Sequence, residues 1–543
     1  MSLPDQIRQF FKGEILNDNL TLTKYSRDAS LFEIKPQLVL FPRNSLDIKK
    51  LVEFVSKNPS LSITARSAGT DMSGGAINDS LILDMTHYFN HIKEIGHDFA
   101  IVQPGVFYRD FEKETLRHDL LLPCYPASRE LNTVGGMAAN NSAGEKTLSF
   151  GQTKDYVERL KVILSDGNEY SFGPMSISEV KHKMRHNSFE GQIYRRMYNL
   201  VMQNLGLIQQ AKPNVHKNSS GYLLWEIWDG QKFDLSKIFV GAQGTLGIIT
   251  EIKYRLIQPK KHSKLVVAFL KEKDMENLGD IVNRVLSLEP ESFESFDDQT
   301  LKVALKFIGE LFKVMRPKNV LSLALQFIPE VWMALAGGMP KLVLIAEFTG
   351  DSEKEVMDKA LNAQQSLKQL HLKTRLTKSA QERKKYWTMR RESFNLLRHH
   401  AGSLRTAPFI DDFCVKPEYL PEFLPKLNRI LKKYELLYTI AGHIGDGNFH
   451  IIPLMDLTDP KTHRIIPELS DKVYNLVLEY RGSITAEHND GLVRGPYLQK
   501  MYGKKVTDLF REVKQIFDPQ NIFNPHKKID ATFSYSWEHI SRS

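Results

Sequence analysis

The chain has 543 residues, of which 42% are hydrophobic and 25% are charged, as in an ordinary folded globular protein. Its two cysteines exclude a disulfide scaffold, a zinc-finger array and an iron–sulfur cluster held by four of its own thiolates. The net charge of +9 comes from short, scattered runs of Lys and Arg. We therefore expect no nucleic-acid partner, although this charge would favour an anionic substrate or an anionic membrane surface.

The N-terminal residues contain no apolar core of a secretory signal, and no stretch of about 18 apolar residues predicts a membrane-spanning helix. We expect a cytoplasmic location, with peripheral attachment to the inner face of the membrane as the alternative.

The first half of the chain alternates short apolar strands with helices. After a polar, helical lead-in over residues 1–35, the hydrophobic pattern predicts a strand at 37–42, a helix at 45–57 and a strand at 61–65. Further short strands are predicted at residues 80–84, 99–103, 157–164, 237–240 and 248–256. This order is typical of an α/β or α+β domain that ends near residue 258.

A connector follows at residues 259–263, and the pattern changes after it. We predict strands and helices in turn at residues 264–270, 273–288, 299–315, 341–348 and 352–370. These pieces favour a second α+β domain with the character of a cap. The predicted parts of the chain are residues 1–258, 259–480 and 481–543.

Residues 301–339 are unusually apolar, and Lys302, Lys306 and Lys313 lie beside an apolar helical stripe. Two interpretations stay open for this segment. One is a buried helix pair, which we favour, and the other is an amphipathic patch that lies on a membrane surface. Pro329 and Glu330 argue against a membrane span.

Three loops rich in small residues lie next to predicted strands of the first domain. Residues 66–76 combine glycines with hydroxyl side chains, and the backbone N–H groups of such a loop can surround a phosphate. Residues 133–144 and 240–251 allow a flat ligand to approach the backbone closely. One such loop is weak evidence, but three in one domain indicate an extended, planar cofactor that carries phosphate.

These loops have a familiar order, with Arg-Ser-Ala-Gly-Thr from residue 66, Thr-Val-Gly-Gly-Met-Ala-Ala-Asn from residue 133 and Gly-Thr-Leu-Gly-Ile-Ile-Thr-Glu from residue 244. They resemble the FAD-binding domain of the vanillyl-alcohol-oxidase (PCMH-type) flavoproteins. Over about residues 20–528, the chain is similar to the D-lactate, glycolate and D-2-hydroxyglutarate dehydrogenase branch. The resemblance implies an α+β fold: a two-subdomain FAD-binding domain, a cap of antiparallel sheet and helices, and a C-terminal segment that returns to the FAD-binding domain.

By this resemblance the cofactor is FAD. The first loop would hold the pyrophosphate through Arg66, Ser67, Ala68, Gly69, Thr70, Asp71, Ser73 and Gly74. The second loop would line the flavin and its ribityl chain, and the third would add two contacts; these residues are Thr133, Gly135, Gly136, Ala139, Asn140, Gly144, Gly247 and Ile249. Relatives with covalent FAD carry His in the first loop, whereas this loop has none, so we expect FAD without a covalent link. Gln243 stands where relatives often have Glu.

A second group of residues has the chemistry of a metal site. His443 and His450 flank a Gly-rich turn between two apolar runs, and a strand–turn–strand arrangement would bring their rings together. Glu487 and His488 supply a carboxylate and a further imidazole, and such side chains bind Zn, Fe or Mn. On spacing alone, a metal site and a chance pair among 17 histidines are equally acceptable.

The resemblance implies individual roles for this group. His443, His450 and Glu487 would bind a divalent metal, with Zn expected before Fe or Mn, and His488 would be the general base. Asn448 would lie beside the substrate. The chain departs from its relatives after Glu487-His488, where Asn489-Asp490-Gly491 replaces the usual Gly.

Recognition of a substrate carboxylate requires a cation, ideally the guanidinium of Arg. Arg390 matches the Trp-x-x-Arg element of the relatives and is our candidate. A Lys that relatives carry two residues before an Asp is Ile410 here. Arg405 or Arg494 would be the compensating cation, and a surface salt bridge is the equal or better alternative for both and for Arg391.

The resulting hypothesis is an FAD-dependent dehydrogenase that oxidises a D-2-hydroxy acid of the lactate, glycolate or 2-hydroxyglutarate type. His488 would accept the hydroxyl proton while the flavin accepts a hydride. Electrons would pass to a separate acceptor, such as a quinone, an electron-transfer protein or an iron–sulfur subunit. The alternatives are a metallohydrolase that uses the same His/His/Glu site, and a non-catalytic flavin-binding subunit of a larger assembly.

Overall fold

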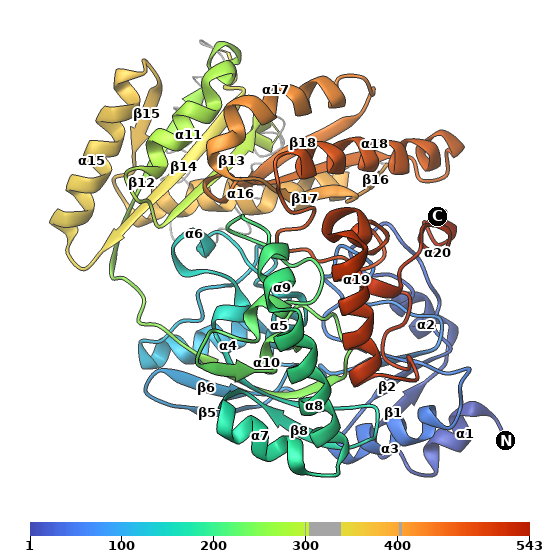
Figure 1. Ribbon diagram of the computed structural model, residues 1–543. Coiled ribbons are helices and arrows are strands. Elements are labelled where there is room, and N and C mark those ends of the chain that lie inside the picture. The colour runs from blue at the N-terminus through green and yellow to red at the C-terminus, as the bar shows by residue number, and fades with distance from the viewer. Residues whose placement is uncertain (299, 303–337, 401–403, 543) are drawn as a thin grey trace.

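The computed structural model describes residues 1–298, 300–302, 338–400 and 404–542. A first domain lies below a cap in Figure 1, and the C-terminal segment lies beside the first domain. The segment at 301–339, interpreted above as a buried helix pair or a membrane patch, lies almost wholly outside the described residues, as does most of the helix predicted at 299–315. None of the helices in the described part of the chain is sufficiently long and apolar to span a membrane.

The first subdomain is built on a small sheet with strand order β1-β2-β4-β3. Its strands and helices are α1 (Leu3–Arg8), β1 (Glu14–Leu16), α2 (Asn19–Tyr25), β2 (Leu38–Phe41), α3 (Ser45–Ser56), β3 (Ile63–Arg66) and β4 (Leu81–Asp84). Strand β4 pairs in parallel with β2 and β3, and every residue of β2 and β4 is buried, as is usual for parallel strands. The lead-in predicted as helical therefore also contains a strand, β1, which pairs with β2.

The second subdomain has an antiparallel sheet of order β5-β6-β11-β7-β8. Its strands are β5 (Ile92–Ile95), β6 (Phe99–Val102), β7 (Val157–Ile163), β8 (Glu169–Phe172) and β11 (Ile248–Arg255), with a separate pair β9 (Pro174–Ser176) and β10 (Lys232–Asp234). Its helices are α4 (Tyr108–Thr115), α5 (Val134–Asn140), α6 (Thr147–Phe150), α7 (Ile177–Arg185), α8 (Phe189–Gln203), α9 (Leu205–Ala211) and α10 (Ser236–Phe239).

The prediction of a strand at residues 237–240 is wrong, because this segment contains most of the one-turn helix α10. Ile238 and Phe239 are adjacent and both buried, so the segment lacks the alternation that a half-buried strand requires. Four residues are too few for the hydrophobic pattern to distinguish the two structures.

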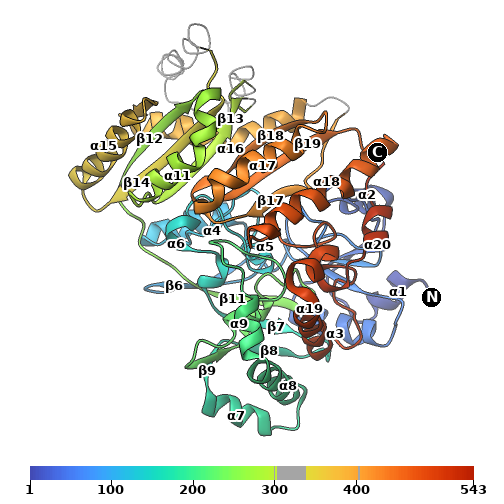
Figure 2. The ribbon, with the colours of Figure 1, turned by 45° about the horizontal axis from the view of Figure 1, so that its top comes forward.

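The cap is an antiparallel sheet of order β15-β12-β14-β13-β18-β19-β16, with β17 also paired to β19. Its strands are β12 (His262–Leu270), β13 (Ser292–Asp297), β14 (Leu342–Gly350), β15 (Lys373–Leu376), β16 (Arg405–Thr406), β17 (Ile410–Cys414), β18 (Leu437–His443) and β19 (Asn448–Met455). Its helices are α11 (Leu278–Leu286), α15 (Glu353–Gln369), α16 (Ala380–His400), α17 (Leu420–Leu431) and α18 (Pro460–Glu479). Helices α15, α11, α17 and α18 form a row along the sheet (Figure 2).

The C-terminal segment packs against the first domain. Helix α19 (Leu498–Phe517) contacts α8 and α9, and α20 (Phe533–Glu538) follows it (Figure 1). Backbone bonds also join it to β3, because Ile63 donates to the carbonyl of Ile522 and Asn524 donates to the carbonyl of Ile63. The segment is therefore an integral part of the first domain's structure.

An ion pair joins the cap to the first domain. Nε of Arg391, on α16, donates to Oε2 of Glu145 at 3.0 Å, and Glu145 follows the second glycine-rich loop. Burial would raise the pKa of Glu145, but Arg391 and the neighbouring cations outweigh it and lower the pKa to about 2. Because the folded-state pKa lies below the ordinary value of 4.5, the pair contributes stability above about pH 4.5 and loses it as the pH falls toward 2.

We therefore expect Arg391→Met to lower the free energy of unfolding at pH 7 by about 1–3 kcal/mol, since Glu145 loses its main partner. The difference in unfolding free energy between variant and wild type should shrink as the pH falls from about 4.5 toward 2, where Glu145 of the folded wild type is also protonated. Urea unfolding at several pH values measures both effects, with Arg405→Met, at an exposed Arg of the cap, as the control. A pH-independent difference would contradict this assignment.

Candidate active site

The three glycine-rich loops converge on one pocket in the first domain. Residues of all three loops line it: Arg66 and Ser67, Gly135 and Ala139, and Gly244, Gly247 and Ile249. A Cβ atom at Gly244 would meet no protein atom within 4 Å, so this wall of the pocket faces open space. The φ angle of +69° at Gly244 also favours glycine. The pocket therefore suits a ligand that touches three segments far apart in the sequence.

Arg66 lies at the pocket but its guanidinium is largely engaged by the protein. It donates to the backbone carbonyls of Tyr25, Arg27 and Ala76 at 3.3, 2.8 and 3.2 Å. Gly69 is required beside it, since a Cβ there would lie 2.3 Å from Nη2 of Arg66. Arg66 therefore shapes the first loop as well as lining the pocket.

The far half of the first loop faces the C-terminal segment. Oδ1 of Asp71 accepts hydrogen bonds from the N–H groups of Ser73 and Gly75, each at 2.8 Å. The Gln243 amide donates to Asp71 and Ser73, and its oxygen accepts from the N–H of Gly491 at 2.8 Å. Gln243, whose role the sequence left open, thus ties the first and third loops to the C-terminal segment. A Cβ at Gly74 would meet Phe32 and Leu492 rather than the pocket.

The second loop reaches from the pocket to the histidine cluster. Thr133 caps α5 by accepting from the N–H of Gly136, and a Cβ at Gly144 would lie 2.0 Å from the carbonyl oxygen of Tyr125. Nδ2 of Asn140 donates to the backbone oxygen of Glu487 at 2.7 Å, while its Oδ1 is buried without a hydrogen-bond partner. The predicted cofactor loop and the predicted metal ligands therefore adjoin.

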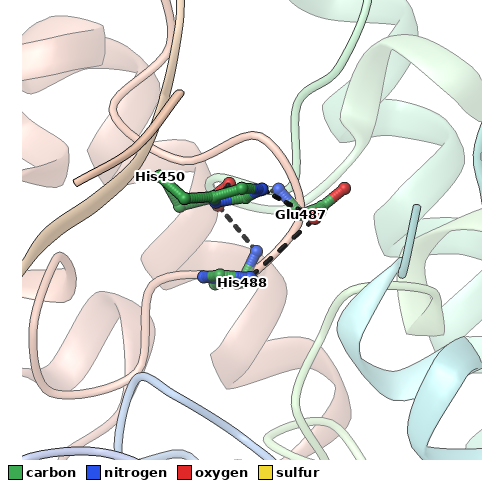
Figure 3. Close-up of side chains that lie close together, drawn as sticks. His450, Glu487 and His488 are labelled. Carbon is green, nitrogen blue, oxygen red and sulfur yellow. Dashed lines mark hydrogen bonds and ion pairs between the residues drawn. The ribbon is translucent and has the colours of Figure 1, made fainter. Parts of the chain in front are cut away.

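The cluster centres on Oε1 of Glu487. Nε2 of His443 lies 3.1 Å from it, Nε2 of His450 lies 3.4 Å from it and Nε2 of His488 lies 3.8 Å from it. Figure 3 shows the contacts of Glu487 with His450 and His488. Strands β18 and β19 are joined by a 3₁₀ turn, and their pairing sets the rings of His443 and His450 5.3 Å apart, as the strand–turn–strand pattern predicted.

Asp412 builds the turn that presents Glu487 and His488. Its Oδ2 accepts from the hydroxyl of Thr485 and from three successive backbone N–H groups, those of residues 486–488. Its Oδ1 accepts from Nδ2 of Asn448 at 3.1 Å. Asp412, His450, Glu487 and His488 offer donor atoms that lie within 4.8 Å of one another. Because both oxygens of Asp412 are already used, we assign it to holding the turn.

Fixed partners set the protonation of each ring. Nδ1 of His450 donates to the carbonyl of Asp411 at 2.7 Å, and burial lowers the pKa of His450, so its Nε2 carries a lone pair. Burial opposes protonation of His443 and His488 too, but neighbouring carboxylates raise the pKa of each to about 9. For His443 these are Glu294 and Glu487, and for His488 they are Asp412 and Asp411.

The candidate arginines have different environments. Arg390 lies 3.2 Å from Oε2 of Glu294, whose other oxygen lies 2.7 Å from Nδ1 of His443, so Arg390 is next to the cluster. Arg494 is fully buried and contacts Asp411, which excludes a surface salt bridge for it. Arg391 pairs with Glu145, and Arg405 is exposed. Asn448 is buried, with no partner for its Oδ1.

Two functional neighbours were missed by sequence reasoning. Glu294, on β13, connects Arg390 with His443. Lys217, in the loop between α9 and β10, is fully buried, and its Nζ lies 3.1 Å from Oε2 of Glu487 and 3.3 Å from Oδ2 of Asp446. For Lys217, the only signal in the sequence was its position beside small polar residues that precede apolar ones. Such runs are common in loops, so this signal is weak.

Comparisons with known families agree with this arrangement. Residues 36–173 match the FAD binding domain family, and residues 261–528 match the family of FAD linked oxidases, C-terminal domain. The chain therefore combines an FAD binding domain with a C-terminal domain of FAD linked oxidases. The predicted resemblance, with an FAD-binding domain followed by an oxidase-type second domain, is confirmed.

The curated relatives of this chain carry names from one group of reactions. The chain is 27% identical to D-2-hydroxyglutarate dehydrogenase of Pseudomonas putida over 95% of its own length and 50% of that protein's. It is 26% identical to glycolate oxidase subunit GlcD of Bacillus subtilis, over 93% of the chain and 91% of the relative. It is 24% identical to D-lactate dehydrogenase of Archaeoglobus fulgidus, over 91% of each. The chain thus spans about half the length of the first of these relatives.

Among solved structures, this chain resembles p-cresol methylhydroxylase, with a TM-score of 0.68 and 15% identity over 98% of the chain and 96% of that structure. The similarity confirms the predicted α+β fold of the PCMH type. At this identity, it concerns the fold alone.

Proposed function

We propose that this chain is an FAD-dependent dehydrogenase that oxidises a D-2-hydroxy acid of the lactate, glycolate or 2-hydroxyglutarate type to the 2-oxo acid. One observation carries the proposal: the loop that lines the predicted cofactor pocket is hydrogen-bonded to the histidine–carboxylate cluster through Asn140 and Glu487. A planar redox cofactor in this pocket and a proton-accepting group in the cluster would lie side by side, as oxidation of an alcohol requires.

The residues present fit FAD. The pocket has walls from three glycine-rich loops, Gly244 leaves one wall open, and Asn140 keeps a buried acceptor without a partner. Arg66, Ser67, Gly135, Ala139, Gly247 and Ile249 would hold the cofactor there. When bound, FAD supplies the oxidising power by accepting two electrons from the substrate. The first loop contains no His, which supports binding without a covalent link.

The donor set also fits a divalent metal. His450 presents a neutral Nε2, Glu487 presents Oε1, and His443 approaches the same oxygen, so these three would be the ligands. Such a metal would hold an α-hydroxy carboxylate and polarise its hydroxyl group. His443 must lose its proton to bind a metal, as ligating imidazoles are neutral. Zn is proposed ahead of Fe or Mn because two imidazoles and one carboxylate suit it.

His488 is the proposed base for the substrate hydroxyl, and it must first lose its own proton, because neighbouring carboxylates raise its pKa to about 9. Its Nδ1 is fixed 2.6 Å from Oδ2 of Asp411, which turns Nε2 toward Glu487 and the proposed substrate site. Arg494 contacts the other oxygen of Asp411, so a buried Arg–Asp pair holds the ring. Asn448, with an unpartnered Oδ1, would accept a hydrogen bond from the substrate.

Arg390 is the proposed partner of the substrate carboxylate. Arg390→Met should lower kcat/KM about 10–100-fold, because a charge-assisted hydrogen bond contributes about 1.5–3 kcal/mol. The kcat/KM of Arg390→Lys should lie between those of the wild type and Arg390→Met, since Lys keeps the charge but lacks the planar guanidinium. Steady-state kinetics with an artificial acceptor measures this effect, with Arg405→Met as the control. Unchanged kinetics with every acid would exclude Arg390 from this role.

Electrons would leave the reduced enzyme to a separate acceptor, such as a quinone, an electron-transfer protein or an iron–sulfur subunit. The two cysteines of the chain, Cys124 and Cys414, are both buried and lie in different domains, so they provide no cluster of their own. Peripheral contact with a membrane is the proposed route to a quinone, and binding of the purified protein to anionic liposomes at low salt would test it.

An anaerobic titration tests the whole proposal. The visible spectrum of the purified protein is recorded, and D-lactate, glycolate, D-malate and D-2-hydroxyglutarate are added with and without a divalent metal. Bleaching of a flavin band by one acid, lost after chelation, is the expected result and names the substrate class. A folded protein that takes up no FAD would overturn the proposal, and bound zinc without flavin would instead support the hydrolase.

A further inference from the structure

A cation lies buried beneath the cluster, where it has no role in the function proposed above. Lys217 is the only described lysine that contacts Glu487, and its side chain is 0% exposed. Its Nζ lies 3.1 Å from Oε2 of Glu487, 3.3 Å from Oδ2 of Asp446 and 3.3 Å from the carbonyl of Gly144. A buried ammonium group has three protons to donate, and these three acceptors account for them.

The two oxygens of Glu487 therefore have different partners. The histidine nitrogens approach Oε1, whereas Lys217 approaches Oε2. The contacts of Lys217 come from three parts of the fold: Gly144 from the second loop, Asp446 from the turn between β18 and β19, and Glu487 from the C-terminal segment. Lys217 is held from all of these sides, so Oε2 cannot rotate into the cluster without breaking a buried charge-assisted hydrogen bond.

We infer that Lys217 is a positioning residue: it reserves Oε2 of Glu487, so that a divalent metal takes Oε1 alone and keeps a coordination position open for the substrate. This inference rests on the proposed metal site. A carboxylate with both oxygens free can occupy two positions around a metal, and a fourth position that protein atoms fill is closed to a substrate. Partners of ligating side chains commonly set their orientation in this way.

The inference predicts opposite changes in two affinities. In Lys217→Met, both oxygens of Glu487 can bind the metal and the repulsion by a buried cation is gone, so affinity for Co²⁺ should rise about tenfold. The open position is lost, so KM for the hydroxy acid should also rise about tenfold. Lys217→Gln keeps a donor for Oε2 without the charge. It should therefore tighten Co²⁺ binding while leaving KM near that of wild type.

Co²⁺ alone is the probe for the metal site, since its visible spectrum reports coordination number without turnover. Wild type and Lys217→Gln should give one spectrum, and Lys217→Met a weaker one typical of a higher coordination number. Lys514→Met is the matched control, because it removes another buried Lys, paired with Asp518, without touching the cluster. It should lower stability and leave the Co²⁺ spectrum unchanged.

Three outcomes decide the matter. Weaker Co²⁺ binding in Lys217→Met together with weaker substrate binding would overturn the inference and make Lys217 a structural residue. If Lys217→Met does not fold, a Co²⁺ spectrum of Lys217→Gln that differs from wild type would overturn it equally. If His450→Ala gives the same Co²⁺ spectrum as the wild type, the proposed metal site is refuted, independently of Lys217.

Discussion

Replacing His488 by Ala should lower the rate of flavin reduction by a D-2-hydroxy acid by about 10²–10⁴-fold, the usual contribution of a general base. The physical reason is its placement, since Asp411 fixes Nδ1 and Nε2 faces the cluster. Flavin content should not change, because no residue of the cofactor pocket contacts the imidazole through a described hydrogen bond. Rapid mixing of the anaerobic variant with substrate, followed at the flavin band, measures the rate directly.

The control for this experiment is His182→Ala, at an exposed position on α7 in the first domain. That variant should reduce its flavin at the wild-type rate. If His488→Ala is also reduced at that rate, the proton is accepted elsewhere and the proposed role of His488 is wrong.

The second large effect is expected at the cofactor pocket, where Ala139→Trp should give a folded but colourless protein. Ala139 lies on α5 and lines the pocket, so an indole there would occupy space that the cofactor needs. A steric conflict of about 3 kcal/mol weakens binding by about 100-fold. The ratio of flavin to protein absorbance, and titration of the apoprotein with FAD, measure the loss.

Ala139→Ser provides the matched comparison, because it changes the same position by one hydroxyl group and should keep its flavin. Circular dichroism of both variants establishes that the fold is intact. An Ala139→Trp protein that still carries one FAD per chain would show that the cofactor lies elsewhere.

The sequence was most informative where local pattern and chemistry coincide. Three glycine-rich loops predicted one extended ligand, and residues of all three line the same pocket. The apolar runs around His443 and His450 predicted a hairpin, and the two residues lie on neighbouring strands, β18 and β19. In both cases the information lies within a few residues, so hydrophobic periodicity and glycine content suffice to find it.

What the sequence did not reveal depends on contacts between distant residues. Lys217 and Glu487 are 270 positions apart, and His443 and Glu294 are 149 apart. No periodicity relates such residues, so their pairing follows only from the packing of the cap, the C-terminal segment and the first domain. Arg494 is a further example. Arginine is usually found at the surface, so its sequence context gives no sign of burial, yet the folded chain encloses Arg494 completely.

The packing of the C-terminal segment against the first domain has a consequence for synthesis of the protein. Glu487 and His488 leave the ribosome after the pocket loops and after the hairpin of His443 and His450. A product that ends before residue 483 would retain that hairpin yet lack its carboxylate and its base, and strand β3 would lose the backbone bonds it makes to residues 522–524. Premature termination anywhere in the cap would therefore remove both the proposed carboxylate ligand and the proposed base, and would leave the first domain without the backbone bonds that complete strand β3.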